Sequence, residues 1–137
     1  MAPAAMVWQL VSDATRYPVW GPWSEAGYHR PGDAAPGGTG AIRWFRYGRT
    51  VTVEEVLAAE PGSLLSYTVV RGIPVRNYLA EVTLSPAGDG THIRWSARWD
   101  PTPGGRIVHR TLVRLYPEVM RRLIAAAEHP VPAGSGA

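Results

Sequence analysis

Two adjacent glutamates interrupt TVTVEEV, an apolar segment with the alternation of a β-strand. Because side chains alternate between the two faces of a strand, Val51, Val53 and Glu55 share one face. A carboxylate on an apolar face loses hydration, so its pKa rises and it can act as a general acid or base. Alternatively, a bulge at Glu54 and Glu55 leaves both carboxylates in water and returns Val56 to the core. Under the first interpretation Glu55 is a catalytic residue.

The preceding segment, RWFRYGR, interleaves arginines with aromatic side chains. If Trp44 and Arg46 point inward, Arg46 can hold an enolate or carboxylate, which makes it a second catalytic candidate. The opposite phase sends other aromatic side chains into a pocket and leaves arginine in water. The same pattern can stack single-stranded bases, but a net charge of +3 is modest for a nucleic-acid-binding protein. We therefore do not expect a nucleic-acid partner.

The sequence lacks the other common catalytic and metal-binding patterns. Cysteine is absent, which removes disulfides, thiolate catalysis and cysteine metal sites. The four histidines have no metal-ligand spacing, and no serine stands in a recognisable arrangement with His and Asp. We therefore expect no metal ion and no cofactor.

The length of 137 residues and the 45% hydrophobic content are typical of one globular domain. No apolar run approaches the roughly 18 residues of a spanning helix, so we expect no membrane span. The first residues lack the charged and apolar regions of a signal peptide. With the absence of cysteine, these features are consistent with a cytoplasmic protein.

The elements that must position the candidate residues are mostly strands. We expect strands near residues 24–29, 41–47, 50–58, 63–70, 76–85 and 91–99, after two short helices within residues 3–17. The last strand is the clearest, because Ile93, Trp95 and Trp99 share one face while Arg94 and Arg98 share the other. A sheet with one wet face must cover its other face with another element.

The covering element is a long helix near the C-terminus. From Pro103 to about His129, apolar residues recur at helical spacing and form one broad stripe. The sequence therefore predicts an α+β fold, in which a curved antiparallel sheet of about six strands wraps around this helix. We expect one domain over residues 1–128 and a flexible tail rich in Pro, Gly and Ala over residues 129–137.

This order of elements resembles the START-like superfamily, also called SRPBCC or helix-grip proteins, and most of all its polyketide cyclase/dehydrase and lipid-transport branch. The resemblance is carried by VWQLVSDATRYPVW, VEEVLAAEPGSLLSYTV, LSPAGDGTHIRW and the terminal helix. It covers nearly the whole chain and implies a helix-grip, START-like ligand-binding fold. It is specific for fold rather than for activity, because the superfamily includes cyclases, lipid carriers, hormone receptors and allergens.

The resemblance also implies a ligand cavity between the helix and the concave face of the sheet. Tyr116, on the helix, then joins Glu55 and Arg46 as a catalytic candidate that can move protons. The ligand-binding residues are expected to be Trp20 and Trp23 at the entrance, with Trp44, Val51, Val53, Tyr78, Ala80, Val82, Ile93, Trp95, Leu112, Val119 and Met120 as walls. For each of them, the alternative is simple core packing.

One departure from the family concerns the start of the sheet. Family members usually open with a strand before the first helix, whereas only MAPAA precedes Met6 here. If that first strand is missing, the last strand has a free edge that invites pairing with another chain. This arrangement predicts a homodimer formed through the free edge.

The implied function is binding of an apolar small molecule by a polyketide cyclase- or dehydratase-like protein of biosynthetic metabolism. Such a pocket folds a reactive poly-β-ketone chain while Glu55, Arg46 or a tyrosine moves protons. The alternative is a non-catalytic carrier of a lipid or other hydrophobic ligand. A carrier protein that delivers the intermediate is a further candidate partner, and Arg121 and Arg122 could contact its acidic surface, unless they form a solvated face with Glu118.

Overall fold

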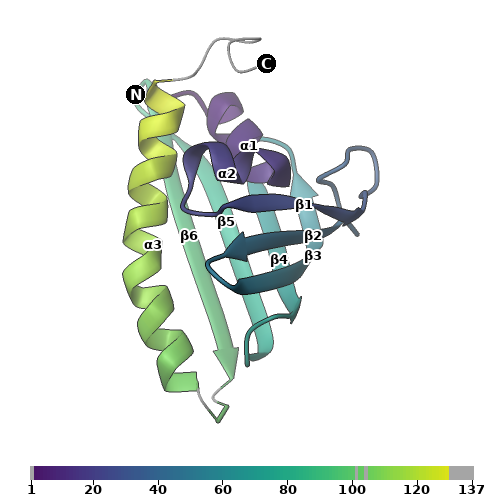
Figure 1. Ribbon diagram of the computed structural model, residues 1–137. Helices are drawn as coiled ribbons and strands as arrows, with labels where there is room; N and C mark the ends of the chain where they lie inside the picture. The colour runs from purple at the N-terminus through teal and green to yellow at the C-terminus, as the bar shows by residue number, and fades with distance from the viewer. Residues whose placement is uncertain (1, 101, 104, 130–137) are drawn as a thin grey trace.

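Six antiparallel strands form one sheet, in which each strand pairs with its neighbours in sequence (Figure 1). The strands are β1 (Glu25–Arg30), β2 (Ile42–Tyr47), β3 (Thr50–Glu60), β4 (Leu64–Arg71), β5 (Arg76–Ala87) and β6 (Gly90–Asp100). The computed structural model describes residues 2–100, 102–103 and 105–129. This strand order confirms the predicted antiparallel meander. The connections between consecutive strands are short, and parallel neighbours would need a much longer crossover connection.

The helices stand at the two ends of the chain. The first are α1 (Ala4–Ser12), the short 3-10 turn η1 (Ala14–Arg16) and α2 (Tyr17–Trp20), and the last is α3 (Gly105–Glu128). Asp13 starts η1, because its Oδ1 accepts a hydrogen bond from the backbone N–H of Thr15 at 3.0 Å. These helices and the sheet confirm the predicted α+β, START-like architecture. The flexible tail was predicted over residues 129–137, and all of it except residue 129 lies outside the described residues.

The close-packed core lies at one end of the molecule, under α1 and the C-terminal half of α3. Val119, Leu123 and Ala127 from α3 are buried there, together with Val11 from α1 and Val82 from β5. Their spacing is that of one helical face, so this half of α3 is held by apolar burial. None of the helices in the described ranges is long and apolar enough to cross a membrane.

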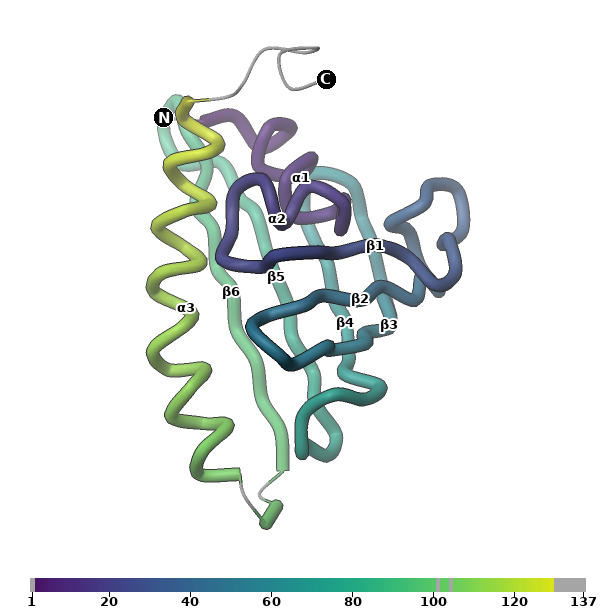
Figure 2. Tube along the Cα trace, viewed as in Figure 1, coloured from purple at the N-terminus to yellow at the C-terminus, as the bar shows by residue number. Residues whose placement is uncertain are grey.

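The N-terminal half of α3 does not pack against a filled core. Leu112 and Leu115 lie on the same stripe but are only half-buried, and they face a cavity instead of packed side chains. Figure 2 shows α3 running along β6, with the hairpin of β2 and β3 reaching toward its middle. Sheet and helix therefore enclose a packed core at one end and a hollow at the other.

The hairpin of β2 and β3 has a register that decides which side chains enter the hollow. Its two-residue turn pairs Tyr47 with Thr50, and the same count pairs Arg43 with Glu54. These pairs lie on the concave face. The pairs Trp44–Val53 and Arg46–Val51 therefore lie on the convex face, since neighbouring residues point to opposite sides.

Candidate functional site

A cavity of about 430 Å³ lies between the concave face of the sheet and the N-terminal half of α3. Its size falls within the range of small-molecule sites in proteins. Most of its wall is apolar, from Trp23, Phe45, Val69, Leu112, Leu115 and Val119. Such a cavity favours an apolar ligand, and its few polar groups decide how the ligand is oriented.

A buried ion pair forms part of the site. Arg43 Nε donates a hydrogen bond to Glu54 Oε1 at 3.0 Å, and Arg43 Nη2 lies 2.9 Å from the same oxygen without a well-aligned hydrogen bond. The Arg43 side chain is 1% exposed and that of Glu54 is 13% exposed, so water screens the pair little. Of the two, only Glu54 lines the cavity. Arg43 therefore stands behind the carboxylate.

Aromatic rings surround the guanidinium. Arg43 lies over the rings of Tyr67, Phe45 and Tyr17, with its Cζ 4.4, 5.0 and 5.4 Å from their centroids. Cation–π contacts of this kind partly replace the water that the buried cation has lost. The Tyr17 hydroxyl accepts a bond from Arg43 Nη1 at 3.4 Å and donates one to the Val11 carbonyl at 2.7 Å. This shell fixes Arg43, and through it Glu54.

Two further pairs place hydroxyl groups at the cavity. The hydroxyls of Tyr78 and Tyr116 lie 2.7 Å apart, which joins β5 to α3 across the hollow. The Tyr67 hydroxyl accepts a bond from Trp95 Nε1 at 3.0 Å. In the tyrosine pair only one hydroxyl donates to the other, so the second keeps a proton for a ligand oxygen. The cavity thus combines a carboxylate with hydroxyl donors.

Burial sets the protonation states of these groups. Loss of hydration raises the pKa of Glu54, while the adjacent Arg43 charge and its hydrogen bond lower it, and the net shift is upward. Burial also raises the pKa of Tyr78, with the nearby Tyr116 adding to the rise, and it raises the pKa of Tyr116. The tyrosines therefore stay neutral donors, and Glu54 is a carboxyl group whose proton affinity is increased.

The raised pKa of Glu54 predicts a pH dependence of stability. The folded state holds this proton more tightly than the unfolded state, so Glu54 favours folding most below its unfolded pKa, and that contribution is lost as pH rises through the folded pKa. Wild type should therefore lose stability relative to Glu54→Gln as pH rises from the ordinary glutamate pKa of about 4.3 through the neutral range. Urea unfolding of both proteins across this range measures the difference. A difference that stays constant would contradict the raised pKa.

Six of the expected site residues line this cavity. They are Trp23, Tyr78, Trp95, Leu112, Tyr116 and Val119. The structure brings together side chains from the loop after α2, two strands and α3, as the expected cavity between helix and sheet requires. Their roles toward a ligand stay predictions.

Five other expected residues lie elsewhere on the inner side. Trp20 is not at the entrance, because it is buried in the core and its Nε1 donates to the Leu10 carbonyl at 3.1 Å. Ala80 and Val82 also belong to the packed core. Ile93 and Met120 line a separate hollow, of about 330 Å³, near the C-terminal end of α3.

The expected inward orientation of Glu55 and Arg46 is wrong. The register of β2 with β3 places both on the convex face. The Glu55 side chain is 39% exposed and lies 3.9 Å from Arg30, while Arg46 Nε donates to Glu25 at 3.0 Å. Neither group is desolvated by the cavity, so neither can take the catalytic role first assigned to it.

The walls expected from Trp44, Val51 and Val53 are misplaced for the same reason. Trp44 covers Gly27 on the convex face, where an added Cβ would lie 3.1 Å from its indole nitrogen. Val53 pairs with Trp44 and is buried there, although it is outside the cavity. The alternative, a bulge that leaves both carboxylates in water and returns Val56 to the core, is right for Val56, which is buried in the core, and wrong for Glu54, which is 13% exposed and lines the cavity. The irregularities of pairing fall at Val53/Glu54 and Val56/Ala58.

Sequence reasoning missed the ion pair of Arg43 and Glu54, although a signal was present. Counting outward from the turn at Gly48 and Arg49 places residue 43 opposite residue 54, and the two have opposite charges. Opposite charges that meet on the same face as Phe45 indicate a buried pair. Tyr67 and its bond with Trp95 had no comparable signal, because the two lie on strands that are not neighbours.

Two other candidate sites can be described briefly. In the described part of the chain, no three His, Asp or Glu side chains gather as metal ligands would. Arg121 and Arg122, considered for a carrier protein, both contact Glu118 Oε1, at 3.3 and 3.0 Å. These are neighbouring turns of one helix, so the contacts match a solvated helix face.

Comparisons with known proteins agree with this geometry. A family model described as "Polyketide cyclase / dehydrase and lipid transport" matches residues 1–128. A search of curated proteins found no match. Among solved structures, a protein from Mesorhizobium loti has a TM-score of 0.75 and 20% identity, covering 96% of this chain and 93% of that one.

Two more solved structures are similar. One, from Thermobifida fusca, has a TM-score of 0.71 and 26% identity, covering 89% of this chain and 83% of its own. A START superfamily protein from Mycobacterium smegmatis has a TM-score of 0.73 and 15% identity, covering 95% and 92%. The chain belongs to the polyketide cyclase/dehydrase and lipid-transport family of the START-like (SRPBCC) superfamily, and this membership implies a hydrophobic ligand.

Proposed function

We propose that the protein binds an apolar small molecule in the cavity between sheet and α3 and acts on it as a polyketide cyclase- or dehydratase-like protein. The observation that carries the proposal is an apolar cavity of about 430 Å³ with one carboxylate and a hydroxyl pair in its wall. A cavity that only stored a ligand would not need a buried charge, which is costly to desolvate.

The chemistry that these groups support is proton transfer. Glu54 takes a proton from a carbon next to a ketone, and a hydroxyl of the Tyr78–Tyr116 pair donates to the ketone oxygen as negative charge develops there. The apolar wall folds the ligand and excludes water, so the reacting ends of one chain meet inside the cavity. In this proposal Tyr116 keeps its catalytic role, and Glu54 replaces Glu55.

A second candidate function is a non-catalytic carrier of a lipid or other hydrophobic molecule. It is favoured by the predominance of apolar side chains in the wall, since a carrier needs only a wall and a way in. Incubation of the purified protein with a poly-β-ketone mimic separates the two functions. An enzyme converts the mimic, whereas a carrier returns it unchanged.

Filling the cavity tests the binding that both candidates share. Thr52, on the inner face of β3 opposite Phe45, lines the cavity, so the variant Thr52→Phe puts a large ring into it. We expect the affinity for anilinonaphthalene sulfonate, a fluorescent apolar dye, to fall by about tenfold or more, because the ring takes the ligand's volume. Fluorescence titration measures the change, and mass spectrometry of copurified molecules gives a second readout.

The matched control makes the same change on the other face of the sheet. Thr83 pairs with Arg94 on the convex face, so Thr83→Phe adds the same ring without entering the cavity. It should leave dye affinity unchanged. If Thr52→Phe binds the dye as well as this control does, the cavity is not the binding site.

A further inference from the structure

The hydroxyl of Tyr67 carries a proton for which the described residues provide no acceptor. Trp95 Nε1 donates to this hydroxyl at 3.0 Å, and it is the one hydrogen-bond partner of the Tyr67 side chain among those residues. An indole N–H can only donate, so the Tyr67 oxygen is the acceptor in this bond and its own O–H stays unused. Tyr67 is 3% exposed and lines the cavity. A buried donor without a partner is costly, and the cavity is the place from which a partner can come.

The bond between Tyr67 and Trp95 spans a strand. Tyr67 of β4 pairs with Ala80 of β5, and Trp95 of β6 pairs with Val82 of the same strand, so both rings stand on the concave face on either side of β5. Strands two apart are separated by roughly 10 Å, a distance that only large side chains bridge. Ala80 is fully buried and carries only a methyl group, which leaves room for the two rings to meet above it. Trp95 therefore fixes the direction of the Tyr67 hydroxyl.

A second unused proton lies in the same part of the wall. In the Tyr78–Tyr116 pair one hydroxyl donates to the other at 2.7 Å, and the second keeps its proton. The ring centroids of Tyr67 and Tyr78 are 6.5 Å apart, and those of Trp95 and Tyr116 are 6.2 Å apart. The four side chains thus form one aromatic cluster, to which β4, β5, β6 and α3 each contribute one ring.

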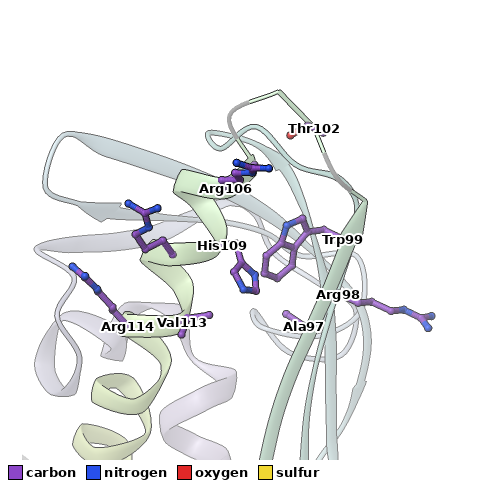
Figure 3. A pocket seen from close by; sticks show the side chains of 10 residues that line it. Ala97, Arg98, Trp99, Thr102, Arg106, His109, Val113 and Arg114 are labelled. Carbon is purple, nitrogen blue, oxygen red and sulfur yellow. The ribbon is translucent and has the colours of Figure 1, made fainter.

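The Tyr78 ring is also supported by a side chain outside the cavity. It stacks on Trp99 of β6, with the centroids 5.6 Å apart and the planes 21° from parallel. Trp99 in turn lies beside His109 of α3, at 5.9 Å, in a groove of about 830 Å³ between β6 and α3, where Figure 3 shows the two rings facing each other. The hydroxyl donors of the cluster are therefore held in place before a ligand arrives, as electrostatic stabilisation of a transition state requires.

No cation is available in the wall to do the same work. Among the described residues that line the cavity, none is an arginine, lysine or histidine. Negative charge that develops on a ligand oxygen must therefore be met by hydroxyl groups. Burial raises the pKa of Tyr67 well above that of an ordinary tyrosine, and the nearby Glu54 charge adds to the rise, so this hydroxyl keeps its proton.

We propose that Tyr67 is a further catalytic residue, which holds the carbonyl oxygen of a ketone substrate together with the free hydroxyl of the Tyr78–Tyr116 pair, and that Trp95 is its positioning residue. The inference rests on the proposed function, in which Glu54 takes a proton from the carbon next to this ketone. The electron pair of the broken C–H bond forms the C=C bond of an enolate, and the carbonyl π pair moves to the oxygen. Two donors match the two lone pairs of a carbonyl oxygen, and both bonds strengthen as its charge grows.

Two probes of nearly equal size and shape test the proposal. They are 2-acetylnaphthalene, a ketone, and 2-isopropenylnaphthalene, in which a CH₂ group replaces the oxygen. Displacement of anilinonaphthalene sulfonate measures both affinities, and infrared spectroscopy measures the carbonyl stretch of the bound ketone. Tyr67→Phe keeps the ring that Arg43 lies over, so it should lower affinity for the ketone about tenfold and leave affinity for the hydrocarbon unchanged. The carbonyl stretch should move to higher frequency, because a hydrogen bond is lost.

Trp95→Phe should lower the ratio of ketone to hydrocarbon affinity in the same direction, although the Tyr67 hydroxyl is still present. The control is Tyr28→Phe, which removes a hydroxyl outside the cavity that accepts from the Ala14 N–H and donates to the Ser12 carbonyl. It should change neither the ratio nor the carbonyl stretch.

The cavity-filling variant Thr52→Phe separates failure of this inference from failure of the proposed function. Both probes should bind it more weakly than wild type. If they do, and the affinity ratio and the carbonyl stretch are the same in wild type and Tyr67→Phe, the role of Tyr67 is overturned while binding in the cavity stands. If Thr52→Phe leaves both affinities unchanged, or if neither probe binds to wild type, the cavity does not hold an apolar ketone and both proposals fail.

Discussion

Arg43→Met is expected to lower the free energy of unfolding by about 3–5 kcal/mol at neutral pH. The substitution keeps an unbranched apolar stem among Tyr17, Phe45 and Tyr67 but removes the cation that faces Glu54. The carboxylate, whose side chain is only 13% exposed, then has no counter-charge in a site that excludes most water. Breaking a buried pair on one side costs more than the pair itself contributes, because a bare charge remains.

Chemical denaturation at neutral pH measures this loss, and two further measurements identify its cause. The double variant Arg43→Met with Glu54→Gln should recover much of the stability, because no buried charge is left unpaired. The loss in the single variant should also shrink as pH falls, because Glu54 takes up a proton, and its raised pKa places this change above the ordinary range of a glutamate. A loss that is the same in the double variant and independent of pH would show that Arg43 acts by packing alone.

The fold could be predicted from the sequence because its signals are strong and repeated. The alternation of β6 indicates one wet face, and the apolar stripe of α3 is the matching cover. Each signal restricts the other: a sheet with one apolar face needs a helix of about its own length. Errors of a residue or two at the ends of elements, such as the start of α3 at Gly105 rather than Pro103, do not change that match.

The same reasoning could not predict which face of β3 points into the cavity. Alternation indicates a buried face only when the other face is wet, but Val53 is buried on the convex face beside Trp44. The valines of β3 therefore mark the wrong side, while Thr52 and Glu54 enter the cavity. The missing information was the hairpin register, which puts Arg43 opposite Glu54 and is a property of two strands together.

The cavity could not be predicted from the periodicity of apolar residues either. Leu112 and Leu123 belong to the same stripe of α3, yet the first borders the cavity and the second is buried in the core. The difference depends on what lies across from each: α1 and β5 supply side chains against the C-terminal half, and none of the helices in the described residues fills the space under the other half. Packing of this kind is decided by the whole fold, so only a family resemblance could suggest it in advance.

Glu54→Gln is expected to reduce turnover of a poly-β-ketone mimic by about 10²–10⁴-fold if the protein is an enzyme. Glutamine keeps the size of the side chain and an oxygen that can accept a hydrogen bond from Arg43, but its amide group cannot take up a proton at neutral pH. Dye affinity should be unchanged, because the apolar wall is intact. The loss therefore falls on the chemical step, as expected for a group that acts in the transition state.

The matched control is Glu55→Gln, which makes the same change one residue away on the convex face, where Glu55 lies beside Arg30. It should leave turnover unchanged, since that carboxylate does not reach the cavity. Mass spectrometry of the product mixture measures both variants against wild type. Equal turnover in wild type and Glu54→Gln would remove Glu54 as the base. A mimic that wild type binds and returns unchanged would instead favour the carrier, and the buried pair would then serve to orient the ligand and to hold the cavity open.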